Sequence, residues 1–142
     1  MPTRLATISD WPAIRHLLVQ LEYPDAADLP VAKMERMLRD PDEVLLVFED
    51  TAGQVMGFLS LHFIPQIALQ GDFARISYFA IDEAARSKGI GKEMEEYCTR
   101  LARERGCHLI EVHCHARRAR AHEFYSRQGF AESPKYLVKR LE

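Results

Sequence analysis

Between Phe73 and Gly106 the chain carries a strand-like run, a basic glycine loop and a long amphipathic helix in direct succession. The run Phe73–Ile81 is typical of a strand because aromatic and β-branched residues recur in it. Strand, loop and helix form one unit, which favours folds that pack helices on a sheet. After the loop, apolar residues recur at the spacing of one helix face: Ile90, Met94, Tyr97, Cys98 and Leu101.

The loop Arg86–Lys92 has the features of an anion site. Gly89 and Gly91 let the backbone turn tightly and approach a ligand. The amides that open the next helix have no partner within that helix, and such amides attract anions. Lys88 and the basic residues at both ends add positive charge, which suits a pyrophosphate better than a single carboxylate. The alternative is a glycine-containing turn whose charges face solvent.

Two common phosphate signatures do not fit this loop. A P-loop requires a glycine five residues before its last one, and no glycine stands there relative to Gly89 or Gly91. A dinucleotide fingerprint requires Gly or Ala three residues after Gly91, where this chain has Met94. The remaining pattern, R-x-x-G-x-G directly before a helix, resembles the pyrophosphate loop of the GNAT superfamily of acyl-CoA N-acyltransferases.

A second segment, Ala121–Phe130, strengthens the resemblance because it follows the closing A-x-x-F-Y-x-x-x-G-F motif of that superfamily. It reads as a short helix that ends at Gly129 in a left-handed cap. From helix spacing alone, Tyr125 would be a core tyrosine with a satisfied hydroxyl. The resemblance implies instead that its phenol lies near the cofactor sulfur and donates a proton to the departing thiolate.

The resemblance also implies acetyl-CoA as co-substrate and assigns its contacts. The backbone of Phe79, Ala80 and Ile81, at the end of the fourth strand, should bond the pantetheine arm as an added strand would. The amides of Ser87–Lys92 should hold the pyrophosphate, and Arg86 occupies a position where the family has Arg or Gln.

One α/β domain over residues 1–142 is expected, because the length is near the mode for domains and 47% of residues are hydrophobic. The resemblance implies a central mixed β-sheet, splayed between its fourth and fifth strands and flanked by helices. Strands are predicted at Arg4–Ile8, Val44–Glu49, Gln54–Phe63, Phe73–Ile81, Cys107–Cys114 and Tyr136–Leu141. Helices are predicted from Ser9 to Leu21, over Val31–Leu38, from Ile90 to Gly106 and from Ala116 or Arg117 to Gln128.

The base that takes the proton of the acceptor amine is a separate question. Many family members carry a carboxylate on the fourth strand where this chain has Ser77. Glu111 matches in register the glutamate that serves as base in the ribosomal-protein acetyltransferases. A lone Glu in an apolar strand indicates either such a role or a salt bridge. His113 and His115 share its side of the strand, and either could relay protons.

The acceptor site is expected at Glu22, Tyr23, Ser77 and His113, with the loop Ile64–Gly71 at its border. The acceptor itself stays open among small-molecule and peptide amines. From a different functional class, the chain would be a noncatalytic acyl-CoA sensor.

His113, Cys114 and His115 also suggest two other chemistries. Cys114 is expected on the opposite face of the strand, so a metal would be bound by His113 and His115 with Glu111 or the nearby His122. The spacing matches no zinc signature, so no metal is expected. In the competing mechanism, Cys114 is a nucleophile that accepts the acyl group. This mechanism is disfavoured because Cys114 lies in an apolar strand, where no base is assured on its face.

Charge and cysteine content restrict the remaining classes. A net charge of −2 gives no reason to expect nucleic acid. The N-terminus leads into no long apolar stretch, so we expect no signal peptide, no membrane partner and a cytoplasmic protein. The three cysteines fit reduced thiols. A homodimer is left open, as is the role of Arg117, Arg118 and Arg120, which could meet coenzyme phosphate or form a solvated patch.

Overall fold

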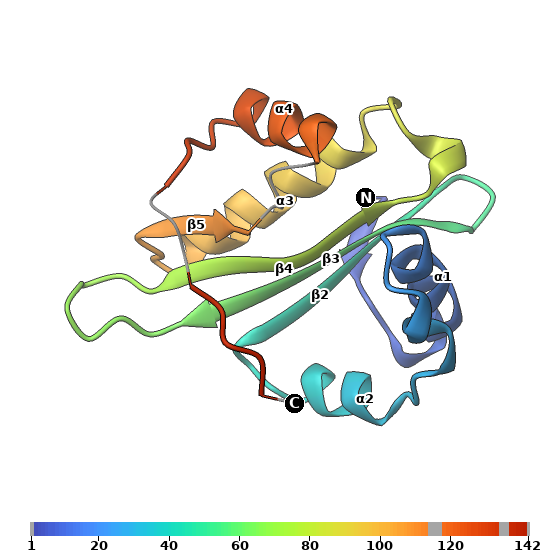
Figure 1. Ribbon diagram of the computed structural model, residues 1–142, viewed down its shortest axis with the longest axis horizontal. Coiled ribbons are helices and arrows are strands. Elements are labelled where there is room, and N and C mark those ends of the chain that lie inside the picture. Colours follow the sequence, from blue (N-terminus) through green and yellow to red (C-terminus); the bar gives the residue numbers. More distant parts are fainter. Residues whose placement is uncertain (1, 114–117, 134–136, 142) are drawn as a thin grey trace.

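One mixed sheet forms the centre of the computed structural model, which describes residues 2–113, 118–133 and 137–141 (Figure 1). Its five strands lie in sequential order. The first four pair antiparallel, and β5 pairs parallel to β4. This confirms the predicted mixed sheet. The strands are β1 (Thr3–Leu5), β2 (Glu43–Glu49), β3 (Val55–Ile64), β4 (Phe73–Ile81) and β5 (Leu109–Val112).

Helices cover both faces of the sheet (Figure 1). On one face, α1 (Trp11–Gln20) and α2 (Ala32–Leu38) bury Ile14, Leu17 and Met34 against the sheet. On the other face lie α3 (Ile90–Glu104), whose Met94 and Cys98 are fully buried, and α4 (Ala119–Arg127). Short 3-10 turns occupy Ile8–Asp10, Pro24–Asp28 and Glu83–Ala85. Within the described part of the chain, no helix has the length and apolar character needed to cross a bilayer.

The sheet splays between β4 and β5, as predicted. Pairing between the two strands covers only Phe73–Ile76 and Leu109–Val112. β4 then continues to Ile81, still paired with β3 on its other edge. Among the described residues, nothing pairs with the β5 side of Ser77–Ile81. The second half of β4 therefore presents a backbone edge that no described strand pairs with.

A β-bulge at Ser77 changes the faces of β4. Ile76 stands opposite Leu61 while Tyr78 stands opposite Ser60, so Ser77 is an extra residue. Ile76 and Phe79 consequently both belong to the core under α3. Tyr78 is turned to the face of α1, together with Ala80. Regular alternation in the sequence does not predict this reversal.

The first and fifth strands are shorter than predicted. β1 ends at Leu5, because the carboxylate of Asp10 accepts the Thr7 N–H at 2.8 Å and turns the chain into the 3-10 segment before α1. Ser9 therefore does not begin the helix. β5 omits Cys107 and His108, because the chain is still leaving α3 there: Cys107 N–H donates to Ala102 C=O at 2.9 Å.

The predicted closing strand, Tyr136–Leu141, is wrong for the part that the structure describes. Leu137–Leu141 forms no strand, and the side chains of Leu137 and Leu141 are almost fully exposed. A strand requires a neighbouring backbone to pair with, and no described strand pairs with these residues. Tyr136 lies outside the described residues, as do the positions predicted to begin the last helix, Ala116 and Arg117.

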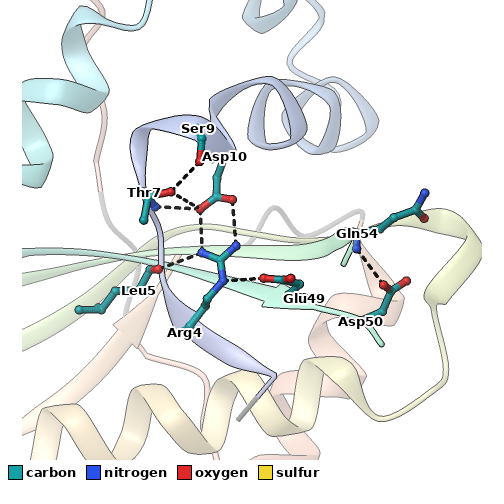
Figure 2. Close-up of polar contacts among 8 residues, drawn as sticks. All are labelled: Arg4, Leu5, Thr7, Ser9, Asp10, Glu49, Asp50 and Gln54. Carbon is teal, nitrogen blue, oxygen red and sulfur yellow. Dashed lines mark hydrogen bonds and ion pairs between the residues drawn. The ribbon is translucent and has the colours of Figure 1, made fainter. Parts of the chain in front are cut away.

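Arg4 ties β1 to β2 and to the beginning of α1 (Figure 2). Its guanidinium donates to both oxygens of Asp10, at 2.9 and 3.0 Å, and to Glu49 Oε1 at 2.8 Å. The Asp10 side chain is only 8% exposed. Hydrogen bonding from Arg4 holds the pKa of the Asp10 carboxyl below its ordinary value.

Asp10→Asn should lower the free energy of unfolding by about 1–2 kcal/mol near neutral pH, since charge-assisted hydrogen bonds are lost. The folded state lowers the pKa of Asp10, so its contribution is complete above the ordinary pKa and is lost as the pH falls through the folded value. The difference between wild type and variant should therefore shrink below about pH 4. Urea unfolding across pH measures it, with exposed Asp28→Asn as control. A difference that is independent of pH would contradict this account.

Candidate functional site

A cleft of about 540 Å³ lies between the unpaired end of β4, the loop before α3, and α4. Of the residues predicted from the sequence to bind a cofactor, all but Lys88 line it. They are Phe79, Ala80, Ile81, Arg86, Ser87, Gly89, Ile90, Gly91, Lys92 and Tyr125. The structure thus brings into one cavity residues that stand up to 46 positions apart, from Phe79 to Tyr125.

The loop before α3 is shaped by two left-handed residues. Ser87 has φ +67° and Gly89, the N-cap of α3, has φ +80°. Alternation of left-handed residues with others turns successive amides to one concave side, which is an arrangement that binds anions. The first amides of α3 have no partner within the helix. A positive φ is costly for a residue with a side chain, so Ser87 marks a constrained turn that the sequence did not reveal.

Gly91 has a different role from Gly89. A Cβ at Gly91 would lie 3.1 Å from Cε1 of Phe124, whereas a Cβ at Gly89 would meet no atom within 4 Å. Gly91 therefore permits close packing of α3 on α4, and Gly89 permits the left-handed turn. A substitution at Gly91 would disturb the packing of the two helices, so Gly89 is the cleaner position for testing ligand binding.

The cleft is strongly cationic. It is lined by Arg86, Lys92, Arg118, Arg120 and Arg127, and no Asp or Glu occurs among its described lining residues. Arg118 and Arg120, which the sequence left open between phosphate contact and solvated patch, lie at the cleft. Arg117 falls outside the described residues. Such a charge distribution suits a ligand that carries several phosphate charges.

Tyr125 lies on α4 in an aromatic cluster at the cleft. Its ring centroid is 5.3 Å from those of Phe124 and Phe130, and 6.4 Å from that of Phe79. The helix ends as predicted, because Gly129 has φ +93° and Phe130 N–H donates to Tyr125 C=O at 3.0 Å. The ring of Tyr125 therefore packs against three aromatic neighbours at the cleft.

A second, smaller hollow of about 300 Å³ lies beside the cleft on the α1 side of β4. Its lining includes the predicted Glu22 and Tyr23, and also Asp25 and Tyr78, which sequence reasoning missed. The rings of Tyr23 and Tyr78 meet edge to face at 5.3 Å. Burial raises the pKa of the Tyr78 phenol. Only the bulge turns Tyr78 to this side, so no sequence signal indicated it.

Three other predicted acceptor-site positions line neither hollow. Ser77 is exposed at the bulge, His113 is exposed after β5, and no residue of Ile64–Gly71 borders either cavity. Glu111 is also absent from the lining residues, and its carboxylate accepts Arg75 Nε–H at 2.6 Å. Glu111 completes a row of ionisable residues that stand opposite one another on β2 to β5: Glu43, His62, Arg75 and Glu111.

No group of three or more His, Cys, Asp or Glu is arranged to bind a metal within residues 2–113, 118–133 and 137–141. Cys114 and His115 lie outside those residues, so the metal and nucleophile alternatives built on them are not described. Cys98 is fully buried, and burial raises the pKa of its thiol to about 12. Cys98 is therefore a protonated packing residue.

Comparison with known proteins agrees with this geometry. The family model "Acetyltransferase (GNAT) family" matches residues 11–130. An aminoalkylphosphonate N-acetyltransferase of Salmonella typhimurium is 28% identical over 89 residues, which are 63% of this chain and 58% of the relative's length. The structure of a transcriptional regulator from Bacillus halodurans superposes with a TM-score of 0.88, at 28% identity and 98% coverage of both chains. A glucosamine-6-phosphate N-acetyltransferase from Arabidopsis thaliana shares the fold, with a TM-score of 0.81 at 21% identity, covering 99% of this chain and 97% of that one.

Proposed function

Because the chain belongs to the GNAT acetyltransferase family, we propose that it transfers the acetyl group of acetyl-CoA directly to a primary amine. The observation that carries the proposal is the cleft, which combines an unpaired strand edge, a left-handed amide loop, a cationic wall and a tyrosine. Each of these features suits a different part of acetyl-CoA.

The binding mode follows from the elements of the cleft. The free edge of β4 at Phe79–Ile81 offers backbone groups to the amides of the pantetheine arm, as in the addition of a strand to a sheet. The loop amides from Ser87 onward and the start of α3 hold the pyrophosphate. The arginines of α4 and of the segment before it neutralise the remaining phosphate charge.

The proposed transfer is a single displacement. The neutral amine nitrogen attacks the thioester carbonyl, a C–N bond forms, and the C–S bond breaks as the tetrahedral centre collapses. The leaving thiolate takes its proton from the phenol of Tyr125, whose ordinary pKa of about 10 makes it a capable acid for this step. The amine loses its extra proton to a base or to water. No covalent enzyme intermediate is required.

The Salmonella relative supports an amine as the acceptor class, since its name identifies an aminoalkyl substrate. Its phosphonate group is not carried over to this chain, because the match spans 58% of that protein's length at 28% identity. We therefore propose a small-molecule or peptide amine as the acceptor. The hollow beside the cleft selects among such amines by their charge.

The experiment that tests the proposal is release of CoA thiol from acetyl-CoA in the presence of pooled primary amines, with mass spectrometry of the pool. We expect thiol release that requires both substrates, together with amines heavier by one acetyl group. Saturable binding of acetyl-CoA without thiol release from any pool would favour the alternative, a noncatalytic acyl-CoA sensor.

For the base, the ion pair with Arg75 favours a structural role for Glu111. We expect Glu111→Gln to lower the free energy of unfolding by about 1 kcal/mol or less, because the pair is partly exposed. The pH profile of kcat/KM should stay unchanged. Arg75→Gln is the matched variant, and the double variant should cost little more than either single one. If Glu111→Gln instead removed a basic group from the profile without lowering Tm, Glu111 would be the base.

A further inference from the structure

The two hollows carry opposite charge. The cleft has five cationic lining residues, whereas the charged residues lining the smaller hollow are Glu22 and Asp25. No Lys, Arg or His occurs among the described residues that line this smaller hollow. A ligand group in the hollow therefore meets negative charge, and an anionic group would be repelled there.

The smaller hollow adjoins the place where the acetyl group would lie. Leu21 and Phe79 line the cleft, while their chain neighbours Glu22 and Tyr78 line the hollow. The bulge at Ser77 is what sends Phe79 and Tyr78 to opposite sides of β4. An amine held in the hollow would thus reach the proposed transfer site from the other side of β4.

The lining between the charges is apolar and aromatic. Leu18 and Leu29 offer surface for a methylene chain, and the faces of Tyr23 and Tyr78 attract ammonium groups. A volume of about 300 Å³ lies at the lower end of small-molecule sites, which suits a short flexible ligand. Glu22 has φ +74°, so its backbone is held in a conformation that such a residue rarely adopts.

We propose that the acceptor is a short aliphatic diamine or polyamine whose distal ammonium is held between Glu22 and Asp25. This inference rests on the proposed acetyl transfer and names its substrate class. The reacting nitrogen must be neutral when it attacks, so an ammonium held by carboxylates cannot itself be the nucleophile. The two carboxylates therefore serve a second, charged nitrogen of the same molecule.

The test compares kcat/KM for three amines with chains of matched length. All three have five carbons: cadaverine ends in a second ammonium, pentylamine ends at the fifth carbon without a polar group, and δ-aminovalerate has a carboxylate as its fifth carbon. We expect cadaverine to exceed pentylamine by at least about tenfold, which corresponds to one favourable charge contact. δ-Aminovalerate should be the poorest of the three. Equal values for cadaverine and pentylamine, or preference for δ-aminovalerate or aminoethylphosphonate, would overturn the inference.

Variants distinguish a loss of ammonium recognition from a general loss of activity. Asp25→Asn and Glu22→Gln should each lower the ratio of kcat/KM for cadaverine to that for pentylamine by about threefold to tenfold. Asp28→Asn removes a carboxylate from the same 3-10 turn but outside the hollow, and the ratio should stay unchanged. A merely structural role for Asp25 would lower both rate constants equally and leave the ratio intact, which would contradict the inference.

Failure of the inference and failure of the proposed function give different results. If pooled amines are acetylated but diamines are not favoured, acetyl transfer stands and the substrate class is wrong. If no amine is acetylated, the proposed function fails and no acceptor exists, but calorimetry with cadaverine on the CoA-loaded protein still decides whether the hollow binds a diamine. Binding that weakens in Asp25→Asn would support the charge assignment, and absence of binding to wild type would overturn it.

Discussion

Gly89→Val is expected to weaken acetyl-CoA binding by about 10- to 150-fold, the range that corresponds to losing about 1.5–3 kcal/mol from one charge-assisted hydrogen bond. Gly89 has φ +80°, a conformation that a β-branched residue adopts only with strain. The loop would relax toward negative φ and turn its amides away from the pyrophosphate. Isothermal titration calorimetry measures the loss directly.

Gly106→Val is the matched control for this variant. Gly106 has φ +72° at the other end of α3, and, as at Gly89, a Cβ there would meet no atom within 4 Å. Both variants should lose about 1–2 kcal/mol of stability from the left-handed conformation. Only Gly89→Val should lose affinity for acetyl-CoA. If both variants lost affinity equally, or if neither variant lost affinity, the loop would not be part of the binding site.

Tyr125→Phe is expected to lower kcat by about 100-fold or more, the usual contribution of a positioned general acid. Affinity for acetyl-CoA should stay within a few fold, because the ring contacts with Phe79, Phe124 and Phe130 are kept. Steady-state kinetics and calorimetry together separate the two effects.

Tyr97→Phe provides the control for loss of a tyrosine hydroxyl. Tyr97 packs on the core from α3, lies under the guanidinium of Arg100 and does not line the cleft. Its kcat should match that of wild type. If Tyr125→Phe kept full turnover across the pH range, Tyr125 would be a packing residue, and water would be the general acid.

The parts of the site that the sequence predicted are those encoded locally. The R-x-x-G-x-G loop needs only its own glycines and the helix that follows, and the closing motif needs only its own turn and cap. The local structure of both segments could therefore be predicted from consecutive residues. The fold brings Gly89 and Tyr125 to one cleft. The mixed, splayed sheet was implied by the family resemblance that these two segments carry.

What the sequence did not predict depends on contacts between distant residues. The bulge at Ser77 is defined by pairing with β3, so the sequence did not predict which face of β4 Tyr78 occupies. The early end of β1 depends on Asp10 reaching back to Thr7. Glu111 showed an unusual charge in an apolar strand, but its partner Arg75 is identified only by the register of β4 and β5. The strand predicted at Tyr136–Leu141 needs a pairing partner, and no described strand pairs with Leu137–Leu141.

Amide hydrogen exchange with and without acetyl-CoA tests the central claim most directly, because it locates the ligand on the wild-type protein. Bound acetyl-CoA should slow exchange in peptides that cover the end of β4 and the loop Arg86–Lys92, where the cleft offers free amides. The β3–β4 connection at Ile64–Gly71, at the opposite end of β4 from Ile81 and absent from the cleft lining, should exchange unchanged. Saturable binding that protects other segments and leaves the loop unprotected would contradict the account.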